Sequence, residues 1–106
     1  MAGQNDQPGE NQQVIERQLV KPREPDMYKV LLLNDDYTTQ EFVVEVIVAV
    51  FHKDIPTATK IMLDVHRLGI GVVGVYSWDI ANTKAEEVHR RAKIAEFPLR
   101  CRIEKA

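Results

Sequence analysis

The sequence contains little of several residue types on which common functions depend. Cys101 is the single cysteine among 106 residues, so no internal disulfide can form. Lys and Arg number 14 against 16 Asp and Glu, a net charge of −2 without any basic stripe, which disfavours a nucleic-acid partner. No run approaches the ~20 apolar residues of a membrane helix, and no basic-then-apolar N-terminal segment indicates a signal peptide. We therefore expect a cytoplasmic protein without a membrane partner.

The patterns of common catalytic and metal sites are also missing. His52, His66 and His89 lie far apart and have no helical metal-ligand spacing. Cys101 falls on the expected inward face of a strand, where a thiol is usually inert packing. There is no nucleophile elbow and no phosphate-binding loop. The sequence predicts no metal, no cofactor and no enzymatic activity.

The 44% apolar content is sufficient for one compact core. Residues 1–26 are rich in Gln, Asn, Gly, Pro and acidic residues and offer few side chains for burial. Pro22 and Pro25 mark the end of this segment. We expect a flexible N-terminal extension over 1–26 and a single folded domain over 27–106.

The first half of that domain reads as a strand followed by two helices. The apolar run 28–33 has the length of a strand covered on at least one face. Thr38 and Glu41 have the spacing of a capping box, which predicts that a helix begins at Thr38, and this helix should end near His52. A second helix is expected between Pro56 and Gly69.

The second half reads as strand, helix, strand. Segment 70–76 is rich in β-branched residues and is expected to form a strand. Its glycines suggest a bulge or a close backbone approach. Ser77 is expected to cap a third helix, which ends before Pro98 and whose apolar stripe contains Ile80, Ala81, Lys84, Val88, Ala92 and Ala95. Leu99, Cys101 and Ile103 alternate with charged residues and predict a final strand. The order β-α-α-β-α-β predicts an α+β fold: a three-stranded antiparallel sheet with three helices on one face.

Acceptor groups are concentrated at the junction Asn34-Asp35-Asp36-Tyr37-Thr38, between the first strand and the first helix. Two interpretations are open from these residues alone. Asn and Asp favour turns and helix starts, which slightly favours a purely structural junction. Alternatively, carboxylate and amide oxygens form a rim for a cationic group. A calcium loop would need more ligands at alternating positions and a turn glycine.

His66 lies at the edge of the second helix's apolar stripe, where a histidine is more often a core-flanking residue than a ligand. If the second helix folds back on the first, His66 approaches Asn34 and Asp36. Together they would surround the mouth of an apolar pocket lined by Val43, Met62 and Val65, a common form of binding site.

Taken together, these motifs resemble the ClpS family, adaptors that bring N-end-rule substrates to the ClpA or ClpC unfoldase of the ClpP protease. The resemblance covers residues from about 27 to the C-terminus. The matching segments are Tyr28-Lys29-Val30, Asn34 to Thr38, Glu41-Phe42-Val43, Ala58-Thr59, Ile61-Met62-Leu63, Val65-His66, Gly74-Val75-Tyr76, Thr83-Lys84 and Pro98-Leu99. The strand and helix order also resembles the C-terminal domain of the ribosomal stalk protein.

The resemblance implies a role for each matching position. Asn34, Asp36 and His66, with Asp35 beside them, would contact the free α-amino group of a substrate's first residue. The pocket for its bulky hydrophobic side chain (the Phe, Tyr, Trp, Leu class) would be lined by Thr38, Gln40, Val43, Val46, Met62, Val65 and Leu99. Asp79 and Lys84 would contact the unfoldase's N-terminal domain. A monomer is expected.

Two positions near the junction depart from the family pattern. Gln40 stands where the family usually has Met, and Thr39 where it often has Pro. A changed set of accepted first residues is therefore one expectation. The alternative function is a protein-interaction domain that modulates the unfoldase with altered or no recognition of N-terminal residues.

Overall fold

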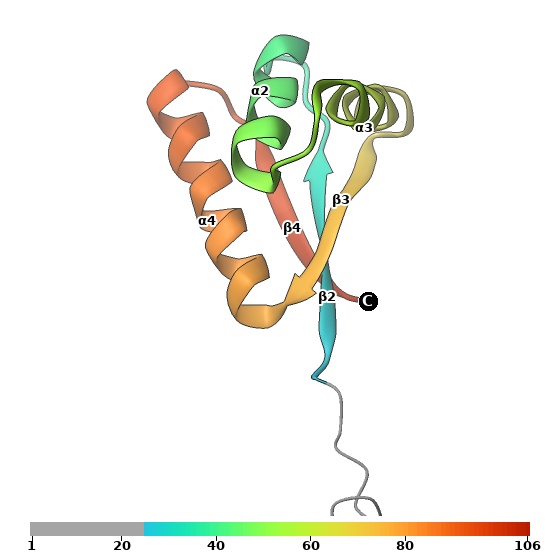
Figure 1. Cartoon of the computed structure of the whole chain (residues 1–106). Helices are drawn as coiled ribbons and strands as arrows, with labels where there is room; N and C mark the ends of the chain where they lie inside the picture. The colour runs from blue at the N-terminus through green and yellow to red at the C-terminus, as the bar shows by residue number, and fades with distance from the viewer. Residues whose placement is uncertain (1–24) are drawn as a thin grey trace, which may run out of the picture.

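The computed structural model describes residues 25–106 and shows the expected α+β fold (Figure 1). Its elements are β2 (Met27–Leu33), α2 (Gln40–Phe51), α3 (Ile55–Leu68), β3 (Ile70–Ser77), α4 (Trp78–Ala95) and β4 (Arg100–Lys105). This is the predicted order of three strands and three helices. The predicted flexible extension falls almost entirely on residues 1–24, which lie outside the described range.

The sheet has the strand order β3-β2-β4, and both pairs are antiparallel. Met27 pairs with Ser77 at one end of β2, and Leu33 pairs with Ile70 at the other. The register between β2 and β3 shifts where Val30 faces Gly74 but Leu31 faces Val72, which leaves Val73 as the extra residue. The bulge expected near the glycines of this strand is confirmed.

The three helices cover one face of the sheet, and the core lies between them (Figure 1). Val30 and Leu32 are completely buried on this face, because alternate residues of a strand point the same way. They join a single cluster with Val46 and Ile47 of α2, Met62 and Val65 of α3, and Val88 of α4. The apolar faces of the strands and helices thus meet in one core between the sheet and the helices.

The start of α2 differs from the prediction by one residue. Thr39, not Thr38, is the N-cap, and its hydroxyl accepts a hydrogen bond from Phe42 N at 3.1 Å. The predicted capping box between Thr38 and Glu41 is therefore wrong. The Thr38 hydroxyl instead donates to Asp35 Oδ2 at 2.7 Å, within the turn that precedes the helix. The predicted end is correct, since His52 is the C-cap in a left-handed conformation.

Proline and glycine mark the limits of the later helices as expected. Asp54 caps α3 by accepting from Thr57 N, Pro56 lies in its first turn, and Gly69 ends it with φ of 87°. Ser77 is the N-cap of α4 but makes no side-chain capping bond.

The predicted apolar stripe of α4 is partly wrong. Ile80 is half exposed and Ala95 is exposed, whereas Ala85, which the prediction omitted, is buried. The buried residues Ala81, Ala85, Val88 and Ala92 have a strict spacing of three or four, so they face the sheet together. Ile80 precedes this stripe by one position and consequently points away from it.

Candidate functional site

The junction after β2 is a turn organised by one side chain, that of Asp35. Its Oδ1 accepts from Tyr37 N at 2.8 Å and from Thr38 N at 2.7 Å, and its Oδ2 accepts from Thr38 Oγ1 at 2.7 Å. Partial burial raises the pKa of Asp35, but the hydrogen bonds from Thr38 and Tyr37 favour the charged form, and the net pKa is lowered. The Asp35 carboxylate therefore builds the turn, as the structural interpretation of the junction predicted.

The two flanking acceptors are not used in this way. Asn34 and Asp36 are exposed, and the side-chain hydrogen bonds of the turn, within residues 25–106, all belong to Asp35. The turn thus separates a structural carboxylate at position 35 from a carboxamide and a carboxylate that remain available to a ligand.

One backbone hydrogen bond brings His66 to this turn. Asn34 N donates to Gly69 O at 2.9 Å, which attaches the end of β2 to the end of α3. The backbone at Gly69 has a φ of 87°, a conformation that is costly for residues with a Cβ. Glycine lacks a Cβ and can therefore end α3 at this point. His66 lies in the last turn of α3, three residues earlier. The predicted approach of His66 to Asn34 and Asp36 is present, since all three line one cavity.

This cavity, called the turn cavity below, has a volume of about 200 Å³. Its walls come from the turn, from α2 and from α3. It is lined by Asn34, Asp35, Asp36, Thr38, Gln40, Val43, Met62, Val65 and His66. Every one of these residues was predicted from the sequence as part of the site.

The apolar side of the turn cavity depends on helical spacing. Met62, Val65 and His66 occupy positions i, i+3 and i+4 of α3, so they share one face, as do Gln40 and Val43 on α2. Met62, Val65 and Val43 are buried, and they form the interior beneath the polar rim. The cavity can therefore hold an apolar group and a polar group side by side.

Val65 is held in place from behind by β3. A Cβ added to Gly71 would lie 2.7 Å from Val65 Cγ2, closer than carbon atoms can approach. Only glycine allows this contact between strand and helix. The close approach expected at this glycine is thus part of the cavity's wall.

Two further residues assigned to the side-chain pocket lie deeper. Val46 and Leu99 are 1% and 3% exposed and belong to the core cluster, not to the lining of the turn cavity. They support the lining residues from below.

The electrostatics of the turn cavity favour a cation. Asp35 and Asp36 carry negative charge, Asn34 adds an acceptor, and none of the nine lining residues is Lys or Arg. Among residues 25–106, no group of three His, Cys, Asp or Glu side chains is arranged to hold a metal ion. A positively charged group that donates several hydrogen bonds suits this rim.

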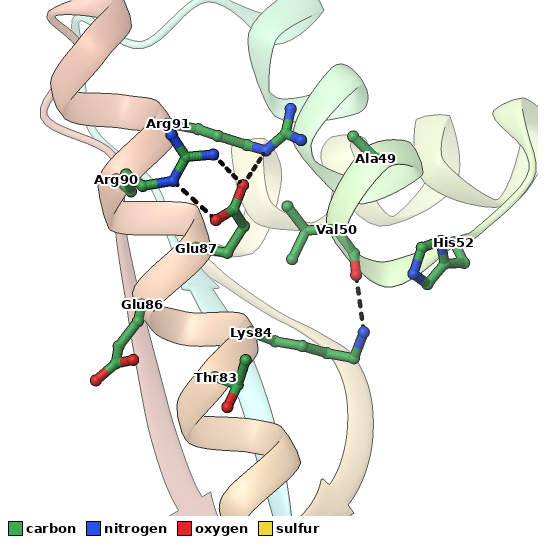
Figure 2. Close-up of a pocket in the computed structure, with 9 residues that line it drawn as sticks. All are labelled: Ala49, Val50, His52, Thr83, Lys84, Glu86, Glu87, Arg90 and Arg91. Carbon is green, nitrogen blue, oxygen red and sulfur yellow. Dashed lines mark hydrogen bonds and ion pairs between the residues drawn. The ribbon is translucent and has the colours of Figure 1, made fainter.

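A second and larger hollow, about 440 Å³, lies between α2 and α4 (Figure 2). We call it the helix groove. It is lined by Ala49, Val50, His52, Thr83, Lys84, Glu86, Glu87, Arg90 and Arg91. Glu87 accepts from Arg90 Nε and Nη2 at 2.9 and 2.6 Å and from Arg91 Nε at 2.8 Å. These bonds lower the pKa of Glu87 to about 2.

Lys84, assigned to the unfoldase interface, has contacts within the domain. Its Nζ donates to Val50 O at 2.8 Å, at the C-terminal end of α2 (Figure 2). The same ammonium lies 5.7 Å from the ring centroid of Phe51 and 5.3 Å from that of Tyr76. Sequence reasoning missed this role, because a contact between residues 34 apart leaves no local signal.

Asp79, the other residue assigned to that interface, is exposed in the first turn of α4. Trp78 and Ile80 beside it are 51% and 50% exposed, and Trp78 packs edge-on against Tyr28 at 5.3 Å between ring centroids. Asp79 therefore lies in an accessible apolar patch. Among the helices of the described part, none is long and apolar enough to cross a membrane.

A family model described as "ATP-dependent Clp protease adaptor protein ClpS" matches residues 23–102. The chain belongs to the ClpS family. Curated ClpS adapter proteins include one from Acetivibrio thermocellus, 61% identical over 77 residues, which cover 73% of this chain and 78% of the relative. One from Paraburkholderia xenovorans is 55% identical over 93 residues, or 88% of this chain and 89% of the relative.

A solved structure of the family also matches. Agrobacterium tumefaciens ClpS2, bound to L-phenylalaninamide, aligns with a TM-score of 0.76 and 47% identity, over 78% of this chain and 100% of that one. The resemblance expected from the motifs is therefore confirmed. This ClpS chain is an adaptor of a Clp protease and not itself the protease.

Proposed function

We propose that the turn cavity binds the free α-amino group and the bulky hydrophobic side chain of an N-terminal residue (Phe, Tyr, Trp, Leu class). Asn34, Asp36 and His66 accept hydrogen bonds from the ammonium group, and Asp35 positions them by holding the turn. Val43, Met62 and Val65 receive the side chain, with Thr38 and Gln40 at its edge and Val46 and Leu99 supporting the floor.

The observation that carries this proposal is the pairing of acceptors with an apolar interior in one small cavity. Its volume of about 200 Å³ is below the roughly 300–1,000 Å³ of sites for drug-sized ligands, so it suits a single side chain. Burial of a Phe or Leu side chain contributes roughly 1.5 to 3 kcal/mol. L-Phenylalaninamide, which the Agrobacterium relative binds, has a free amine beside an aromatic side chain.

We further propose that the chain delivers such substrates to a ClpA- or ClpC-type unfoldase in the cytoplasm. Asp79, exposed between Trp78 and Ile80, would contact the unfoldase's N-terminal domain directly. Lys84 would act mainly by fixing the end of α2 beside it.

The decisive experiment compares a short peptide that begins with Phe with its N-acetylated twin by calorimetry. We expect a dissociation constant on the order of micromolar for the free amine. Acetylation removes the charge and should weaken binding about 100-fold or more. Equal binding of the two peptides would overturn amine recognition and favour an interaction domain that modulates the unfoldase.

Selectivity for the first residue is tested with peptides that begin with Phe, Tyr, Trp, Leu or Ile. The chain and its Gln40→Met variant should rank these peptides differently, because Gln40 brings a polar amide to the edge of the cavity. Identical rankings would show that residue 40 does not select the first side chain.

Delivery is tested with the unfoldase's N-terminal domain. Asp79→Lys should weaken that complex and leave the affinity for the Phe peptide unchanged. An unchanged complex would exclude Asp79 from the interface.

A further inference from the structure

Gln40 separates the turn cavity from a neighbouring hollow. This neighbouring space, here called the outer hollow, is distinct from the helix groove. It measures about 510 Å³ and is lined by Gln40, Glu41, Val44 and Met62. Gln40 and Met62 line both spaces. They therefore lie at the boundary between the two spaces, where a ligand that occupies both would contact them.

A peptide bound as proposed above has a restricted path. Its ammonium group lies at Asn34, Asp36 and His66, and its first side chain lies among the apolar residues of the turn cavity. The third substituent on the first Cα is the carbonyl group that leads to the second residue. If the peptide continues from the turn cavity toward the outer hollow, this carbonyl and the N–H of the second residue pass beside Gln40 and Met62, which line both spaces.

Gln40 has the chemistry to bind a peptide group at this point. Its carboxamide has an oxygen acceptor and two N–H donors, which complement the N–H and C=O of a peptide bond. Gln40 is exposed, and none of the side-chain hydrogen bonds within residues 25–106 involves it. A methionine at this position would offer only a weak thioether acceptor.

Resting on the proposed function, we infer that Gln40 is a specificity-determining residue that hydrogen-bonds the first peptide group of the substrate. Its carboxamide oxygen accepts from the N–H of the second residue, and the outer hollow receives that residue's side chain. The preferred substrates are consequently chains whose second residue has an amide N–H, which excludes proline.

The test removes this N–H without changing the shape of the ligand. Phe-Ala-amide is compared with the ester analogue in which lactic acid replaces alanine, so that an oxygen replaces the second N–H. A net hydrogen bond of ordinary strength makes the ester bind about threefold to tenfold more weakly to the unaltered chain. In Gln40→Met the two ligands should bind with nearly equal affinity.

Met62→Leu is the matched control, because it alters the other residue at the boundary between the two spaces and leaves Gln40 in place. The ratio of the two affinities should remain at its original value in this variant. The Gln40 side-chain amide resonances should also shift on addition of Phe-Ala-amide and shift less with the ester.

An equal ratio in the unaltered chain and in Gln40→Met would overturn the inference. This outcome differs from failure of the proposed function, in which the free-amine ligands fail to bind or bind no better than their acetylated forms. Amine-dependent binding with an unchanged ratio would remove the role of Gln40 alone.

Discussion

The turn cavity and the helix groove show that size does not identify a binding site in this domain. The helix groove is the larger, about 440 Å³ against about 200 Å³. Four of its charged side chains nevertheless already have partners in the protein: Glu87 pairs with Arg90 and Arg91, and Lys84 donates to Val50 O. A ligand there would have to displace bonds that already exist. Of the acidic and amide side chains at the rim of the turn cavity, only Asp35 already accepts hydrogen bonds from the protein.

The difference arises from how each set of charges is placed along the chain. Glu87, Arg90 and Arg91 are three or four residues apart on one helix, the spacing at which side chains meet and neutralise each other. Asn34 and Asp36 flank a turn, and His66 comes from another element. Within residues 25–106, the side chains of Asn34, Asp36 and His66 make no hydrogen bond, so their hydrogen-bonding capacity remains for a ligand.

Asp36→Ala tests the comparison with the largest expected effect. Removing this carboxylate should weaken binding of a Phe peptide by about 2 to 5 kcal/mol, because the bound ammonium loses a charged partner in a cleft that the ligand closes to water. Calorimetry at low salt measures the change. The control is Glu86→Ala in the helix groove, which should leave the affinity unaltered. Equal losses in both variants would mean that net charge, not the rim, attracts the peptide.

Gly71→Ala should have the next largest effect. The new methyl group would lie 2.7 Å from Val65 Cγ2, so the wall of the turn cavity must move. We expect a loss of about 1 to 3 kcal/mol in the free energy of unfolding, measured in urea, and weaker peptide binding.

The double variant Gly71→Ala/Val65→Ala serves as the control for this contact. Its loss of stability should be smaller than the sum of the two single losses, since the clash is absent once Val65 is shortened. Strict additivity would show that position 71 does not act through Val65.

Lys84→Met tests whether the pairing in the helix groove stabilises the domain. It keeps most of the aliphatic chain but removes the ammonium from the C-terminal end of α2 and from the Phe51 and Tyr76 rings. Unfolding in urea should require about 1 to 2 kcal/mol less, while peptide affinity stays the same. Unchanged stability would mean that the Lys84 ammonium gains no more from these contacts in the folded protein than it gains from water in the unfolded chain.

Glu87→Gln should have the smallest effect, and it should depend on pH. The pKa of Glu87 is lowered from 4.5 to about 2 by Arg90 and Arg91, so its contribution to stability is complete above pH 4.5. It is lost as the pH falls through about 2. The stability difference between the two proteins should therefore be present at pH 7, diminish in acid and shrink with added salt. A difference that is constant from pH 7 to pH 2 would contradict the ion-pair origin.

The sequence predicted the limits of elements well where one residue acts locally. Pro56 and Gly69 bound α3 because their backbone preferences do not depend on distant contacts. The choice between Thr38 and Thr39 as N-cap could not be made in this way. Both residues can cap a helix, and only the folded turn shows that Thr38 bonds to Asp35 while the hydroxyl of Thr39 accepts from Phe42 N.

The sequence predicted which residues surround the candidate site. It did not predict which of them build the turn and which remain available to a ligand. Asn34, Asp35 and Asp36 are indistinguishable as acceptors in the sequence. Only the hydrogen bonds of the folded turn assign Asp35 to structure. Likewise, the contact of Lys84 with Val50 connects two helices, and no periodicity within either helix predicts it.

The register of β2 against β3 also fixes how far apart the two proposed tasks of the chain lie. Leu33 and Ile70 pair at the end of β2 that leads into Asn34 and the turn cavity, whereas Met27 and Ser77 pair at the opposite end, where α4 and Asp79 begin. Six residue steps at about 3.3 Å each make this separation roughly 20 Å. If both proposals hold, the sheet acts as a spacer of fixed length, and a captured chain end and an unfoldase would not compete for the same surface.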